Sequence, residues 1–292
     1  MRIGRGIANL LVTGLAVELA VMPFALFHFH KAGLYGVVAN IVAIPLTTFV
    51  ILPLEFGALL LDSIGLGRPL WLLAGQAITF LLWIAHSVAA STRMATIADM
   101  PAWSLAAIAL GGLWLGLWTG RPRLAGLAPI AIGLVGALAT PVPDLLITGD
   151  GRHLAIVERG VPLLLRERAG DYVRSLMSEV AAFDGDPQDL GAARSGICSR
   201  DSCIARVARG GRHWTILATR TGQRIDWVPL TRACAEADIV ISDRWLPRGC
   251  TPRWLRLDRQ MLQRTGGVAI YLGSKPRAVT VAERIGGHPW AS

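Results

Sequence analysis

The stretch LYGVVANIVAIPLTTFVILPLEFGALLL, residues 34–61, decides the class of the fold. Glu55 is the only charged residue in this stretch. A helix of this length is long enough to cover the roughly 30 Å hydrocarbon core of a bilayer. Pro45 and Pro53 interrupt the stretch, so it predicts either one tilted, kinked helix or two pieces with irregular backbone between them. Either arrangement places the chain in a membrane.

Four further apolar stretches have lengths close to that of a membrane span, and they cover residues 10–27, 70–90, 103–119 and 124–146. The composition agrees, because 53% of the residues are hydrophobic, 17% are charged, and the mean hydropathy is +0.48. An ordinary soluble protein is less apolar. Residues 1–143 therefore predict a helical bundle of about five spans. None of the stretches reads as a cleavable leader, because the first lacks a small-residue cleavage site and further spans follow it.

Positive charges predict the orientation of these spans, because cytoplasmic loops carry an excess of Lys and Arg. The arginines expected in the cytoplasm are Arg2, Arg5, Arg68, Arg121 and Arg123. The opposite loops hold Lys31, Arg93 and Asp99. An odd number of spans then places the C-terminal half in the periplasm of an inner-membrane protein. This parity argument fails if residues 34–61 are re-entrant.

Residues 144–292 predict one soluble domain of mixed α+β or α/β structure. Short apolar runs of strand length replace the long stretches, and turns at 149–151 and 158–160 separate the first three runs. The predicted strands are 145–148, 154–157, 163–165, 204–207, 214–218, 239–242 and 268–272. Helical spacing of apolar residues predicts helices over 171–183 and 230–236, and residues 184–199 predict a loop.

All four cysteines lie in this C-terminal half: Cys198, Cys203, Cys234 and Cys250. Four cysteines allow three pairings, and an even number outside the cytoplasm favours disulfides over free thiols. We predict Cys198–Cys203 and Cys234–Cys250, because a short polar loop separates the first pair and the second pair flanks one strand and its loop. No Cys-x-x-Cys motif points to zinc.

The C-terminal half is basic, with 22 Lys or Arg against 16 Asp or Glu, and Lys275 is its only lysine. The planar fork of arginine suits phosphate, so this charge is compatible with nucleic-acid contact. A composition bias toward arginine explains the same count without any ligand. Both explanations remain open from the sequence.

A few polar residues in or beside the first two spans are candidates for the path of a substrate. Glu18 lies in the middle of the first span, where a carboxylate is costly and usually faces the bundle interior or a water-filled path. His28, His30 and Lys31 follow at the outer end of that span, where they either contact phosphate or cap the helix. Asn40 predicts a hydrogen bond to a neighbouring helix.

The runs FHFHKAGLYG (residues 27–36) and ANIVAIPL (39–46) resemble a stretch typical of ComEC-type competence proteins. The runs DLLITGDGRH (144–153) and ADIVISDRWL (237–246) resemble a divergent tail domain of that family, which is metallo-β-lactamase-like in better-preserved members. A full-length family member has a further soluble domain and further membrane helices before the point where this sequence begins. The chain therefore resembles a fragment or a truncated paralogue.

The resemblance implies the fold of the tail domain but not its metal chemistry. A metallo-β-lactamase-type hydrolase needs a His-x-His-x-Asp-His cluster to hold divalent metals. The C-terminal half has only His153, His213 and His288, each isolated, and Ser242-Asp243-Arg244 stands where relatives have a His-His-Gly run. We therefore expect no metal, no cofactor and no catalytic residue.

The resemblance implies translocation of single-stranded DNA across the inner membrane during natural transformation. Single-stranded DNA, the lipid bilayer and other competence proteins or a missing N-terminal portion are the partners that this function implies. Three alternatives stay open at this point. They are a membrane-anchored metal-dependent nuclease, a small-solute transporter built around the stretch broken at Pro45 and Pro53, and a remnant of a split gene.

Overall fold

The computed structural model describes residues 2–33, 36–91, 95–166, 168–193, 196–223 and 225–286. Its contacts divide the chain into two compact units, Met1–Ala139 and Thr140–Ser292, and each unit is described by itself. The division lies close to the boundary at 143–144 that the sequence suggests. Arg93 and His288 lie outside the described residues.

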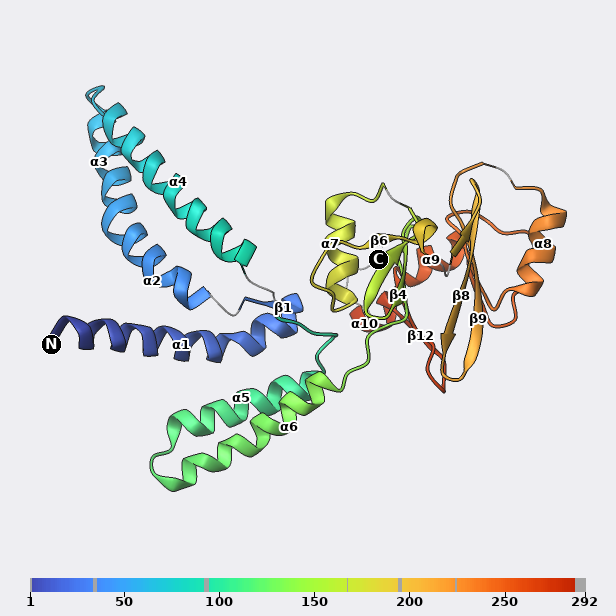
Figure 1. Ribbon diagram of the computed structural model, residues 1–292, viewed down its shortest axis with the longest axis horizontal. Helices are drawn as coiled ribbons and strands as arrows, with labels where there is room; N and C mark the ends of the chain where they lie inside the picture. Colours follow the sequence, from blue (N-terminus) through green and yellow to red (C-terminus); the bar gives the residue numbers. More distant parts are fainter. Residues whose placement is uncertain are drawn as a thin grey trace. The chain divides into compact units, whose positions relative to one another are not determined.

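The stretch 36–62 is one continuous run of helix (Figure 1). Helix α2 (Gly36–Leu46) passes into a π-helical turn, η1 (Thr47–Ile51), and then into α3 (Leu52–Asp62). The π turn lies between the two prolines, and the Thr47 hydroxyl donates hydrogen bonds to the carbonyl oxygens of Ala43 (2.8 Å) and Ile44 (3.0 Å). Of the two alternatives for this stretch, the single helix is correct and irregular backbone is wrong.

Four helical segments are long and apolar enough to cross a membrane within the part of the chain that the structure describes. They are Val12–Phe29, Ala39–Asp62, Arg68–Ala90 and Arg121–Leu138. The first lies in α1 (Arg2–Phe29), the third in α4 (Arg68–Ser91), and the last comprises the 3-10 turn η2 (Arg121–Gly126) and α6 (Leu127–Leu138).

The structure differs from the prediction of about five spans in two places. The fourth predicted span forms α5 (Ala102–Leu117), a 16-residue helix of about 24 Å, which is shorter than a bilayer core. The fifth ends at Leu138 instead of 146, because residues 145–147 pair as a strand of the second unit.

Two short strands join the C-terminal ends of α1 and α4. β1 (Lys31–Ala32) follows α1, and β2 (Ala95–Thr96) follows α4. The two strands pair antiparallel, with Lys31 opposite Thr96 and Ala32 opposite Ala95. The C-terminal ends of α1 and α4 therefore meet.

Glycines bring α5 and α6 together as a close antiparallel hairpin. A Cβ atom added at Gly111 would lie 2.5 Å from the Gly126 carbonyl oxygen, and one added at Gly133 would lie 2.6 Å from the Ser104 carbonyl oxygen. Small residues at such positions let helix backbones approach each other inside a membrane. Gly136 lies close to Trp103 and Ser104, so the end of α6 lies beside the start of α5.

The second unit contains two β-sheets, in agreement with the α/β class that its strand-length runs predict. The six-stranded sheet has the order β13-β12-β3-β4-β5-β6, and the five-stranded sheet has the order β11-β10-β9-β8-β7. The first sheet consists of β3 (Leu145–Ile147), β4 (Leu154–Glu158), β5 (Val161–Leu164), β6 (Gln188–Asp189), β12 (Val268–Tyr271) and β13 (Arg277–Thr280). The second consists of β7 (Gly196–Cys198), β8 (Ser202–Arg209), β9 (Arg212–Thr219), β10 (Ile239–Ile241) and β11 (Leu255–Leu257).

The main core lies between the two sheets, and helices cover their outer faces. Ile156, Trp214, Ile239 and Ile270 are among the buried residues of this core. α7 (Asp171–Val180) packs on the six-stranded sheet through Met177, and α8 (Trp227–Glu236) packs on the five-stranded sheet through Leu230 and Cys234. Figure 1 shows α7 and α8 on opposite sides of the paired sheets.

The short edge elements are where the predictions for this unit are wrong. The predicted loop over 184–199 contains β6, the 3-10 turn η3 (Leu190–Ala192) and β7. Two strands, β11 and β13, and two helices, α9 (Arg259–Thr265) and α10 (Val281–Ile285), were not predicted. The tight turns at 149–151 and 158–160 are confirmed, because β3, β4 and β5 pair antiparallel in sequence order.

Two disulfides join the four cysteines in the predicted pairs. Cys198 and Cys203 face each other across the β7–β8 hairpin, and Cys234 on α8 bonds to Cys250 in the segment before β11. Cys234 and Cys250 are both fully buried, in the core under α8. The second disulfide therefore holds α8 against residues 244–254.

We predict that removing the Cys234–Cys250 bond destabilises the second unit more than removing the Cys198–Cys203 bond. The Cys234–Cys250 bond joins residues 16 positions apart, and the Cys198–Cys203 bond joins residues 5 positions apart. The loss of chain entropy in the unfolded state then stabilises the fold by about 3 kcal/mol for the longer loop and about 2 kcal/mol for the shorter one. Pulse proteolysis of the full chain in urea would measure the free energy of unfolding of the second unit in the wild type and in both double Cys→Ala variants. An equal or larger loss from the Cys198–Cys203 variant contradicts the prediction.

Candidate functional site

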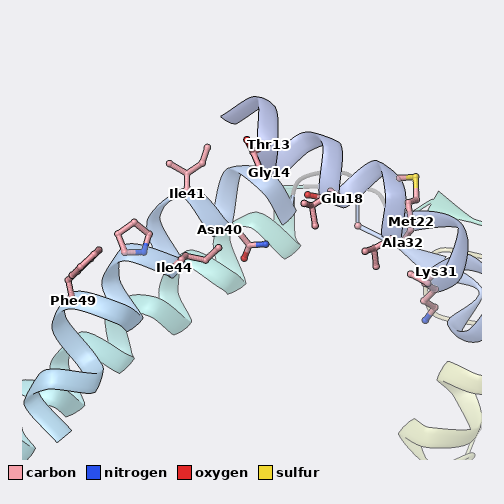
Figure 2. A pocket seen from close by; sticks show the side chains of 15 residues that line it. Thr13, Gly14, Glu18, Met22, Lys31, Ala32, Asn40, Ile41, Ile44 and Phe49 are labelled. Atoms are coloured by element: carbon pink, nitrogen blue, oxygen red, sulfur yellow. The ribbon is translucent and has the colours of Figure 1, made fainter. Parts of the chain in front are cut away.

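A groove of about 740 Å³ lies between α1 and α2 and contains two of the four residues predicted to line the path of a substrate. Glu18 and Lys31 line it, together with Asn40 and a largely apolar wall that includes Met22, Ile41, Ile44 and Phe49. Figure 2 shows Glu18 on α1 across from Asn40 on α2, with Lys31 farther along toward the end of α1. The groove therefore has one carboxylate, one ammonium group and one amide in apolar surroundings.

His30 lies at the junction of α1 and β1, where it contacts the segment after β2. Its Nε2 lies 3.6 Å from Asp99 Oδ1, and its carbonyl oxygen accepts a hydrogen bond from the Ile97 amide (3.1 Å). His30 has φ of +58°, a left-handed conformation that turns the chain out of the helix. We call the paired strands β1 and β2, together with the contacts of His30 to Ile97 and Asp99, the clasp. His30 therefore belongs to the clasp and does not line the groove.

His28 is exposed and packs edge-on against the ring of Phe27, with 5.1 Å between ring centroids. The four residues predicted to line one path therefore occupy three places. Glu18 and Lys31 share the groove, His30 belongs to the clasp, and His28 lies on the surface of α1.

A second, polar pocket of about 370 Å³ lies in the soluble unit. It is lined by Arg152 from the turn after β3, Asp243 and Arg244 from the loop after β10, and Arg259 at the start of α9. Asp150, Gln263 and the glycines Gly149 and Gly222 complete the lining. We call it the basic pocket.

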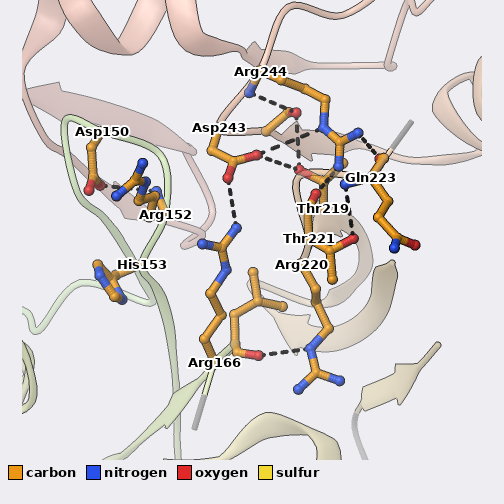
Figure 3. Close-up of polar contacts among 12 residues, drawn as sticks. Asp150, Arg152, His153, Arg166, Thr219, Arg220, Thr221, Gln223, Asp243 and Arg244 are labelled. Atoms are coloured by element: carbon orange, nitrogen blue, oxygen red, sulfur yellow. Dashed lines mark hydrogen bonds and ion pairs between the residues drawn. The ribbon is translucent and has the colours of Figure 1, made fainter. Parts of the chain in front are cut away.

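Asp243, which lines the basic pocket, contacts the guanidinium groups of Arg166 and Arg244 (Figure 3). Its carboxylate accepts a hydrogen bond from Arg166 Nη2 at 2.8 Å and one from the buried Thr219 hydroxyl at 3.4 Å. Arg244 Nε lies 3.9 Å from the same carboxylate, and the Arg244 guanidinium donates to the carbonyl oxygens of Thr221 and Gln223. The guanidinium of Arg244 is therefore fixed by its neighbours.

The turn after β3 carries a carboxylate and an imidazole with shifted pKa values. Burial raises the pKa of Asp150, but hydrogen bonds from the Thr148 hydroxyl and the Arg152 amide, with the nearby charges of His153 and Arg152, lower it on balance. Burial lowers the pKa of His153, the charge of Asp150 raises it, and the charges of Arg166 and Arg152 lower it. Asp150 therefore stays ionised near neutral pH, where His153 is neutral.

The described residues contain no group of three or more His, Cys, Asp or Glu side chains that could hold a metal ion. The basic pocket combines two carboxylates with arginines, and arginine does not bind metals because it is always protonated. Its chemistry is that of an anion site.

Comparison with known proteins bears on the N-terminal half. Residues 2–122 match the family model described as "Competence protein". This segment includes α1 to α5 and therefore the whole groove, so the resemblance to competence proteins is confirmed over this part of the chain.

The uncharacterized protein YcaI of Escherichia coli (strain K12) is 34% identical over 82 residues, which are 27% of this chain and 11% of that protein. The chain thus spans about a tenth of the length of this curated relative. No solved structure matched the chain. The metallo-β-lactamase likeness of residues 144–292 accordingly has no support from a structural match.

The sequence did not predict which distant residues the fold brings into contact with the candidate site residues. Asp99 lies 69 positions after His30 in the chain, and the β1–β2 pairing brings them together. Arg152, Arg244 and Arg259 come from three separate segments. The first two lie in the runs 144–153 and 237–246 that carry the family resemblance, whereas the arginine excess was the only signal for Arg259.

We predict that acid destabilises the second unit through His153. The unfolded chain takes up a proton near the usual pKa of about 6.5, whereas the folded unit resists it, so the free energy of unfolding falls as pH drops below that value. Pulse proteolysis at pH of about 7.5 and about 5.5 should show a smaller loss for His153→Gln than for the wild type. Equal losses in the two proteins would rule out His153 as the cause.

Proposed function

We propose that this chain is an inner-membrane component that passes single-stranded DNA into the cell during natural transformation. The observation that carries the proposal is the match of residues 2–122 to the competence-protein family, which suggests a role in DNA uptake. The groove between α1 and α2 lies inside this segment and supplies a candidate path. We further propose that residues 144–292 are a degenerate metallo-β-lactamase-like domain without hydrolytic activity.

The β1–β2 pairing supports a definite topology for the bundle. Lys31 and Thr96 lie opposite each other, so an even number of crossings separates them. If α2–α3 were re-entrant and α4 crossed, the two strands would lie on opposite sides of the membrane. The pairing therefore favours full crossings by both, which matches their lengths.

The α5–α6 hairpin extends this argument to the soluble unit. The end of α6 lies beside the start of α5, so the chain leaves the hairpin on the side where it entered, whether or not α5 crosses fully. That side is the one that holds the β1–β2 pair, and it is opposite to Arg68, Arg121 and Arg123. The positive charges of these three arginines favour the cytoplasm for their own side. The two disulfides favour an oxidising compartment for the soluble unit on the other side.

The polar groups of the groove suit two different tasks. Lys31, near the outer clasp, would attract DNA phosphates in a salt-dependent manner. Glu18, deeper in α1, would repel phosphates and would instead pair within the bundle or gate it. Further helices from another chain, or from a missing N-terminal portion, would cover the exposed apolar faces of the groove.

We predict that the soluble unit is accessible from outside the cytoplasm. Protease added to sealed spheroplasts should degrade residues 144–292, because the β1–β2 pairing, the two disulfides and the distribution of positive charge all favour that side. Immunoblotting with an antibody to the C-terminal end would follow the digestion, and a cytoplasmic protein should stay intact as the control. Full protection until the cells are lysed would reverse the proposed topology.

We predict that the groove residues affect DNA entry without affecting insertion. Replacing His28, His30 and Lys31 together by Gln should lower transformation frequency at unchanged membrane abundance, because it removes the Lys31 ammonium group from the groove together with the two neighbouring imidazoles. Glu18→Gln should alter transport or assembly without changing capture of DNA at the cell surface. The strain must supply any missing N-terminal portion.

Single variants separate the three places that the structure distinguishes. His28→Gln serves as the matched control, because His28 lies outside the groove and the clasp and should transform like the wild type. Lys31→Gln should account for most of the loss. Wild-type transformation by the triple variant and by Glu18→Gln, at equal abundance, would remove the conduit role of these residues.

A further inference from the structure

An aromatic hollow of about 270 Å³ adjoins the basic pocket of the soluble unit. The two share Arg244, which lines both. Trp227, at the start of α8, and Trp245, directly after Arg244, form walls of the hollow, and Leu230, Leu246 and Pro247 add an apolar floor. A cationic cavity and an aromatic cavity are thus joined at a single side chain.

The two tryptophans are exposed although the same unit buries aromatic groups elsewhere. Trp227 is 59% exposed and Trp245 is 63% exposed, whereas Trp214 in the main core is 1% exposed. The fully buried Cys234–Cys250 disulfide ties the helix that carries Trp227 to the segment that carries Trp245. The hollow is therefore built from two elements that a disulfide joins, and more than half of the surface of each tryptophan is exposed.

The basic pocket has more donors than its carboxylates can satisfy. Arg166 pairs with Asp243, and Asp150 accepts from Thr148 and from the Arg152 amide. In the described part of the chain, Arg152 and Arg259 form no ion pair within 4.0 Å, and the buried Nε atoms of Arg166 and Arg244 have no hydrogen-bond partner. Three arginines against two carboxylates leave the pocket with an excess of positive charge, which suits an anion such as phosphate.

We infer that the basic pocket and the aromatic hollow together bind single-stranded nucleic acid, with backbone phosphate at Arg152, Arg244 and Arg259 and a base stacked on Trp227 or Trp245. This inference deepens the proposed function and rests on it for the origin of the strand as incoming DNA. Sequence-independent binding of single strands combines a cationic groove with aromatic platforms. Bases in a duplex are already stacked on one another, so the hollow selects the single strand.

The test measures binding of a fluorescent oligodeoxythymidylate of 12 nucleotides to the full chain in detergent micelles, by anisotropy over a range of KCl concentrations. Replacing Arg152 and Arg259 by Gln should weaken binding and flatten the plot of log K against log salt by about 0.7 for each lost phosphate contact. Replacing Trp227 and Trp245 by Ala should weaken binding by about five-fold or more without changing that slope.

Matched controls come from the same unit. Arg206→Gln removes an exposed arginine of β8 that lines neither cavity, and Tyr172→Ala removes an exposed aromatic group of α7. Both should bind like the wild type. A hairpin duplex with the same number of phosphates should respond to the arginine changes but not to the tryptophan changes. A nonreducing peptide map that recovers the Cys234–Cys250 bond shows that each variant is folded.

No binding by the wild type, or equal binding by the wild type and both double variants, overturns the site. This result is independent of the transformation assay. If the groove variants transform normally and the binding pattern holds, the proposed function falls and the nucleic-acid site stands. If groove variants lose transformation and the double variants bind normally, the site falls and the proposed function stands.

Discussion

The membrane unit depends on one constraint, which is that every backbone polar group inside hydrocarbon must find a partner within the protein. Two prolines in the stretch 36–62 each remove a donor, yet the helix continues through a π turn in which the Thr47 hydroxyl bonds to two backbone carbonyl oxygens. Because the helix is continuous, α2 and α3 together are long enough to cross a membrane. It also lets α4 return to β1, where the β1–β2 pair joins the C-terminal ends of α1 and α4.

The soluble unit follows a different rule, because water can satisfy its surface and the apolar core decides its architecture. Strand residues alternate between the two faces of each sheet, as Cys203, Ala205 and Val207 do on the buried face of β8. Two sheets share one core, and α7 and α8 cover the outer faces. The polar groups then gather at loop ends, where the basic pocket and the aromatic hollow lie.

Sequence alone predicted the elements whose signal is local. The apolar stretches predicted the helices of the first unit, and seven strand-length runs predicted the central strands of the second. Short elements such as β7 and β11 were missed, because three residues carry little periodicity and their pairing is decided by distant strands. The contacts of His30 with Asp99 and of Arg166 with Asp243 span 69 and 77 positions, so only the fold could reveal them.

The α5–α6 hairpin limits where any solute can travel. Its two helices meet on backbone atoms, since even a methyl group at Gly111, Gly126 or Gly133 would overlap the facing helix. An interface of this kind leaves no room for water or a lipid chain, and sliding one helix along the other would drive side chains such as Ile108 into the opposite backbone. The two helices therefore behave as one rigid unit, and no solute can pass between them.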